Sequence, residues 1–183
     1  MIPTGFMAKR IVNRPEWLQA AAVEDILSVS GHISEAFADT ISAWQHNGFW
    51  LFNAPQAIQS LAAEQAVDLN GCRFFYYEVF ELEFDVQEGQ WRPVEPEKSF
   101  PTAVQPWEKK QLEGFDVVTF SSGTAPECSP LSCNRLAETV PVNRHCLLES
   151  IEDARRLIDA GAFEHAEPGP FRIFSVWSCS LEQ

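Results

Sequence analysis

The residues best suited to chemistry lie in one segment, 121–134, which reads SSGTAPECSPLSCN. It follows a predicted strand and precedes a predicted helix. Thiols at the start of a helix face the positive end of its dipole, which lowers the pKa of a thiol. Cys128 and Cys133 are therefore candidate nucleophiles, with His145 or His32 as the base.

The same segment predicts a small-ligand site, because loops at strand ends are where binding and catalytic residues usually gather. The candidate ligand-binding residues are Ser122, Gly123, Glu127, Ser132 and Asn134. The alternative is a purely structural loop, in which Ser, Pro and Asn form turns and the cysteines fill apolar space. The residue types favour this alternative, since a Cys–His pair has meaning only once its geometry is known.

A zinc site is the other chemistry that these residues suggest. Cys128 and Cys133 have a spacing at the loose end of that seen for metal ligands, and His145 and Cys146 would complete a set of four. Neighbouring residues of a strand point to opposite faces, however, so His145 and Cys146 are not expected to converge. We expect no metal. We also expect no cofactor, and the sequence contains no GxGxxG or GxxxxGK[ST] motif for a nucleotide.

A long strand predicted over 74–86 carries two further features. Glu78 falls among aromatic residues, where a buried carboxyl would have a raised pKa and act as an acid or base. The alternative is an ion pair between Glu78 and an arginine such as Arg73 or Arg172.

The opposite face of this strand carries Glu81, Glu83 and Asp85. Alternate residues of a strand lie about 6.6–6.8 Å apart, so the three carboxylates are expected to form a row. The row is a candidate surface for a basic partner. The alternative is a solvated strand face whose charges discourage edge pairing.

Charge supports an acidic binding surface. The chain of 183 residues has 13 basic and 26 acidic side chains, giving a net charge of −13. Residues 15–97 alone contribute −12, since they contain fourteen acids and only two arginines. This balance argues against binding to nucleic-acid phosphates and favours a basic protein partner, although solubility is a simpler explanation of the surplus.

The number of cysteines and the N-terminal residues indicate the cellular compartment of the protein. There are five cysteines, an odd number, and the first residues show no sustained apolar stretch of the kind found in a signal peptide. No apolar run approaches the roughly 20 residues that a membrane-spanning helix needs. We therefore expect a cytoplasmic protein with reduced thiols and no contact with membranes.

The elements that must position these residues suggest an internal duplication. A helix is predicted over 35–47, a strand over 49–52, and a second helix capped by Asn53. Adding 97 to residues 49–81 aligns them without a gap on residues 146–178, with Ser150 as the equivalent cap. The predicted fold is α+β, a mixed sheet with packed helices, built from a strand–helix–strand–helix–strand unit that occurs twice.

The predicted organisation is one compact domain of four parts. These are an irregular basic arm (1–22), a first repeat (23–86), a connecting strap (87–114) and a second repeat (115–183). Three aromatic residues of the strap, Trp91, Phe100 and Trp107, suggest a possible homodimer face.

The resulting functional hypothesis is a non-catalytic binding protein, inhibitor-, immunity- or adaptor-like, with an acidic face for a basic protein. The alternative is a small enzyme or ligand-binding domain that uses segment 121–134 in a cleft between the repeats.

Overall fold

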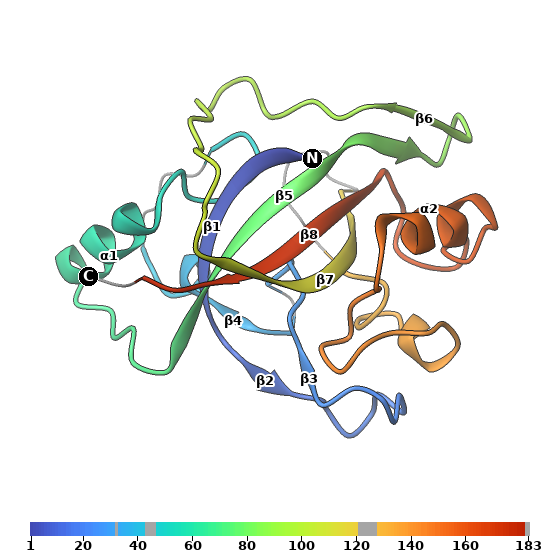
Figure 1. Cartoon of the computed structure of the whole chain (residues 1–183), viewed down its shortest axis with the longest axis horizontal. Helices are drawn as coiled ribbons and strands as arrows, with labels where there is room; N and C mark the ends of the chain where they lie inside the picture. The colour runs from blue at the N-terminus through green and yellow to red at the C-terminus, as the bar shows by residue number, and fades with distance from the viewer. Residues whose placement is uncertain (32, 43–46, 121–127, 182–183) are drawn as a thin grey trace.

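The computed structural model describes residues 1–31, 33–42, 47–120 and 128–181. Its centre is a six-stranded sheet in the order β4-β1-β5-β8-β7, with β6 paired to β5, and β2 and β3 form a separate pair (Figure 1). All of these pairings are antiparallel. The strands are β1 (Ile2–Arg10), β2 (Val12–Asn13), β3 (Asp25–Ile26), β4 (Glu35–Ala36), β5 (Cys72–Asp85), β6 (Gln90–Pro93), β7 (Lys110–Thr119) and β8 (Phe171–Cys179).

Two α-helices lie at opposite ends of the sheet, α1 (Pro55–Glu64) beside β1 and α2 (Ile151–Asp159) beside β7 and β8 (Figure 1). Pro55 suits the first turn of α1, where its missing N–H costs no hydrogen bond. Ser150 caps α2, as predicted, by accepting a hydrogen bond from the backbone N–H of Asp153 at 3.0 Å. The cap of α1 is Ala54 rather than the predicted Asn53. Two single 3₁₀ turns, η1 (Phe37–Asp39) and η2 (Leu136–Glu138), are the other helical elements of the described residues.

The core consists of two apolar clusters. The larger one includes Phe6, Phe75 and Tyr77 from β1 and β5, and the smaller one includes Ile26 of β3 and Ile173 of β8. Among the described residues, no helix is long and apolar enough to cross a bilayer.

The predicted fold class was wrong. The structure is mostly sheet, with 33% of residues in strands and 15% in helices, and it contains no duplicated strand–helix–strand–helix–strand unit within the described residues. Residues 35–42 form β4 and a 3₁₀ turn instead of a helix. Residues 49–51 form a turn, and Phe52 makes only an isolated bridge to Phe6. Apolar residues at helical spacing misled the prediction, because they are buried here by tertiary contacts rather than along one helix face.

The two halves share a unit smaller than the predicted one, which includes an asparagine that closes a turn against a strand. The Asn47 side chain donates to the carbonyl of Thr4 at 2.7 Å, and that of Asn143 donates to the carbonyl of Glu113 at 2.7 Å. Each side-chain oxygen accepts two backbone N–H groups of its own turn. The neighbouring strand residues are Gly5 and Gly114, at φ values of +139° and +144° that side chains rarely adopt.

The N-terminal segment 1–22, predicted as an irregular arm, contains β1, which pairs with both β4 and β5. Six consecutive residues of this strand are buried, so it lacks the in–out alternation that reveals a half-exposed strand. The strap 87–114 contains β6 and the first residues of β7. Its Trp91 packs edge-on against Phe84, and its Trp107 packs edge-on against Phe6 of the same chain.

Candidate functional site

Segment 121–134 is only partly described by the structure. The predicted ligand-binding residues Ser122, Gly123 and Glu127 lie outside the described residues, as does His32. Ser132 is buried and donates its hydroxyl to the carbonyl of Ser129 at 3.3 Å. Asn134 accepts hydrogen bonds from the Cys128 thiol at 3.8 Å and from the backbone N–H of Glu167 at 3.4 Å.

The candidate nucleophile Cys128 lies in surroundings that disfavour its thiolate. Its pKa is raised, first by a hydrogen bond with Cys133 and then by burial. The predicted helix is a single 3₁₀ turn, η2, which supplies little dipole to lower a thiol pKa. Burial also raises the pKa of Cys146 to about 12. The described geometry therefore does not activate the thiols of Cys128 and Cys146 as nucleophiles.

A buried polar cluster beneath this segment was not anticipated from the sequence. Asp116 on β7 accepts hydrogen bonds from the Ser129 hydroxyl at 2.5 Å, the Ser28 hydroxyl at 2.9 Å and the Val29 N–H at 2.8 Å. Lys9 on β1 is 2% exposed and donates to three backbone carbonyls in the same region. The sequence signal for this cluster was weak: Lys9 directly follows the apolar residues Phe6, Met7 and Ala8 of β1.

Burial changes the titration of both charged groups in this cluster. It lowers the pKa of Lys9 to about 8 and raises that of Asp116. In each case desolvation disfavours the charged form more strongly than the neighbouring groups favour it.

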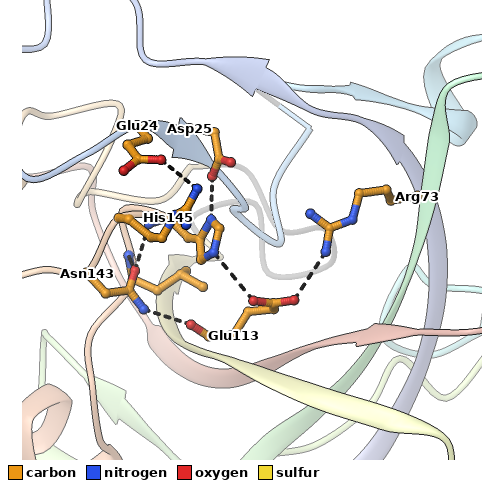
Figure 2. A network of polar contacts seen from close by, with 8 residues as sticks. Glu24, Asp25, Arg73, Glu113, Asn143 and His145 are labelled. Atoms are coloured by element: carbon orange, nitrogen blue, oxygen red, sulfur yellow. Dashed lines mark hydrogen bonds and ion pairs between the residues drawn. The ribbon is translucent and has the colours of Figure 1, made fainter.

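His145, the candidate base, lies between two carboxylates (Figure 2). Its Nδ1 is 2.6 Å from Asp25 Oδ1, and its Nε2 is 3.5 Å from Glu113 Oε2. Glu113 also pairs with Arg73 at 3.2 Å. The Asn143 turn holds the His145 backbone, since the asparagine side chain accepts the His145 N–H at 2.9 Å.

This arrangement joins β3, β5 and β7 through side chains. A protonated imidazole would donate to both carboxylates, whereas a neutral one can donate to only one of them. With a carboxylate at each ring nitrogen, His145 is placed to link elements rather than to serve a separate nucleophile. Within the described residues, no group of three or more His, Cys, Asp or Glu side chains is arranged to hold a metal ion.

Glu78, the candidate acid or base, pairs with a cation that the sequence did not identify. Lys110 Nζ lies 2.6 Å from its Oε1, and the Tyr76 hydroxyl donates to the same oxygen at 3.2 Å. The ammonium group also lies over the rings of Tyr76 and Trp177, at 4.6 and 4.2 Å from their centroids. Arg73 and Arg172, the predicted partners, pair with Glu113 and Glu83 instead.

The three carboxylates predicted to form a row differ in their exposure and their partners. Glu81 is exposed, but Glu83 is only 4% exposed and accepts hydrogen bonds from both Arg92 and Arg172. Asp85 pairs with Arg92 at 2.7 Å. The pairing of β5 with β8 shifts register between Val79 and Glu83, which interrupts the simple alternation assumed from sequence.

No protein-family model, curated protein or solved structure shows significant similarity to this chain.

Proposed function

We propose that the protein is a non-catalytic cytosolic binding protein that uses an acidic surface to engage a basic protein partner. The single observation that carries this proposal is a concentration of exposed carboxylates at one end of the molecule. We define this acidic end by seven exposed residues: Glu81, Glu88, Glu149, Glu152, Asp159, Glu164 and Glu167.

Contacts between distant parts of the chain bring elements that carry these residues to the same end. The β5–β6 hairpin and α2 both lie there (Figure 1). The Trp91 indole of β6 donates to Asp159 of α2 at 2.8 Å, and the guanidinium of Arg155 lies 5.5 Å from the centres of both the Trp91 and Phe80 rings.

Most cations of the described chain pair with carboxylates outside this set of seven. Arg10, Arg73, Lys110 and Arg172 do so in other parts of the fold, and Arg92 pairs with Glu83 and Asp85. Arg155 and Arg156 of α2 lie at the acidic end, where the seven carboxylates outnumber them. None of the seven carboxylates of the acidic end forms an ion pair with a described residue. Complementary charge accelerates encounter and selects a partner of opposite sign.

A comparison of two charge-reversal variants tests the proposal. Glu88→Lys/Glu164→Lys changes the acidic end, whereas Glu64→Lys/Glu108→Lys makes the same change in net charge at exposed sites outside it. Partners are captured by cross-linking from a lysate at low and moderate salt and identified by mass spectrometry.

We expect to capture a basic protein that binds the unmodified chain at low salt. Added salt should weaken this binding, and only the first variant should abolish it. Equal loss of partner binding with both variants would show that binding depends on net charge and not on the acidic end. Capture that is insensitive to salt and to both variants would contradict the proposal.

A further inference from the structure

We propose that a cavity between the β5–β6 hairpin and β8 binds a small organic carboxylate. This inference is independent of the proposed function, because it concerns a small ligand and different side chains. The cavity has a volume of about 400 Å³, within the range of roughly 300–1,000 Å³ typical of small-molecule sites. Its charged lining residues are Glu83, Asp85, Arg92 and Arg172.

The carboxylates of the cavity are already occupied. Glu83 accepts from Arg92 Nε at 2.9 Å through one oxygen and from Arg172 Nε at 2.7 Å through the other. Asp85 uses one oxygen for Arg92 at 2.7 Å and the other for the backbone N–H groups of Gln87 and Glu88. A cationic ligand would therefore compete with the two arginines that already bind these carboxylates.

The two guanidinium groups, in contrast, retain donors. A guanidinium carries five N–H donors in a planar fork. Arg172 uses two of its nitrogens, one toward Glu83 and one toward the carbonyl of Glu95 at 3.3 Å. Arg92 also uses two, toward Glu83 and Asp85. The unused hydrogen-bonding capacity of the cavity is thus mainly donor capacity, which a carboxylate satisfies through two oxygens.

Burial makes Arg172 the rigid part of this site. It is 5% exposed, and its guanidinium carbon lies 4.1 Å from the centre of the Phe120 ring. The Arg92 side chain is 50% exposed and therefore lies partly in solvent. A ligand between them would meet one fixed and one adjustable guanidinium.

The remaining wall and the charge balance define the ligand further. Apolar surface for the body of the ligand comes from Val86, Phe120, Pro168 and Pro170. The two arginines are balanced by Glu83 and Asp85, and the whole chain carries −13. A monoanion is therefore favoured over a phosphate dianion, which the surrounding negative field would repel more strongly.

Titration with four aromatic probes of similar size tests this assignment by calorimetry and NMR. The probes are benzoate, phenyl phosphate, neutral benzamide and cationic benzamidine. We expect saturable binding of benzoate, weaker binding of phenyl phosphate, and no binding of benzamide or benzamidine. Tighter binding of benzamidine than benzoate would overturn the assignment, as would the absence of saturable benzoate binding at millimolar concentration.

A variant at the exposed arginine localises the binding. Arg92→Gln removes a guanidinium without emptying a buried position, and we expect about a tenfold loss of benzoate affinity, the equivalent of roughly one charge-assisted hydrogen bond. Arg135→Gln is the matched control, since Arg135 is an exposed arginine paired with Glu138 and does not line the cavity. Unchanged affinity in Arg92→Gln, or equal loss in both variants, would refute the site.

Discussion

Lys9 on β1 and Asp116 on β7 bind the same three-residue segment, 28–30, although two other strands separate β1 from β7 in the sheet. Lys9 donates to the carbonyls of Ser28, Val29 and Ser30 at 2.6–2.9 Å. Asp116 accepts from the Ser28 hydroxyl and the Val29 N–H. The segment thus bridges two distant strands through one cation and one anion, both buried.

Because Lys9 is buried, we expect the free energy of unfolding to depend on pH in a specific way. The pKa of Lys9 is lowered from 10.5 to about 8 in the folded protein. Between these values the unfolded chain holds a proton that the folded chain has released, so the free energy of unfolding rises with pH. Relative to Lys9→Met, the unmodified protein should gain about 3 kcal/mol across this interval.

Urea unfolding of both proteins at several pH values from neutral to above 10 measures the difference. Lys98→Met is the control, because the Lys98 side chain is 85% exposed and the substitution should leave the slope unchanged. Parallel stability curves for Lys9→Met and the unmodified protein would contradict the burial of a titrating Lys9.

Gly114 is expected to tolerate no side chain. A Cβ there would lie 2.7 Å from Leu147 Cβ and 2.9 Å from the Leu148 carbonyl oxygen, at a φ of +144°. Gly114→Ala should lower the free energy of unfolding by about 2–4 kcal/mol, because steric overlap adds to backbone strain. Gly89→Ala is a matched control at a φ of +63° with no atom within 4 Å, and should cost only about 1–2 kcal/mol. Chemical denaturation measures both, and equal losses would show that crowding at Gly114 is unimportant.

His145 should contribute to stability through the two carboxylates beside it. His145→Gln removes the ring nitrogens near Asp25 and Glu113, and we expect a loss of about 1–3 kcal/mol, since partly buried acceptors lose their partner. The neighbouring Arg144 pairs with Glu24, and both side chains are more than 60% exposed. Arg144→Gln should therefore cost less than about 1 kcal/mol. Chemical denaturation of the two variants at neutral pH measures both losses. Similar losses would show that the His145 contacts contribute no more than a solvent-exposed ion pair.

Four of the five cysteines are expected to react slowly in the folded protein. The pKa values of Cys72 and Cys128 are raised, and burial raises those of Cys146 and Cys179 to about 12 and about 11. Since the thiolate is the reactive form, iodoacetamide should label these four positions far more slowly at neutral pH than in the urea-unfolded chain. Mass spectrometry of the labelled peptides reports each rate. Rapid labelling of Cys128 at neutral pH would restore the nucleophile hypothesis.

Predictions from the sequence were confirmed for local features, whose structure depends on neighbouring residues. Alternating aromatic residues predicted the long strand over 74–86, observed as Cys72–Asp85, and Ser150 was identified as a helix cap. Such features depend on backbone geometry and on partners within a few residues, so they can be recognised without the rest of the fold.

The helix predicted over 35–47 is absent from the described part of that range, residues 35–42 and 47, for the opposite reason. Asn47, expected to end that helix, instead bonds to the carbonyl of Thr4, 43 positions away, and to Asn53. Similarly, Glu83 was assigned to an exposed row, but Arg172, 89 positions away, holds it in the interior. Local periodicity contains no information on such pairings.

The amino-acid sequence by itself determined the negative charge, the long aromatic strand and the cap of α2, because these follow from composition and short-range geometry. Tertiary structure alone decided which charges are buried and which remain on the surface. It placed Lys9 and Asp116 around one segment and set Glu83 between two arginines, since the cost of desolvating a charge is met only by partners that folding brings from distant parts of the chain.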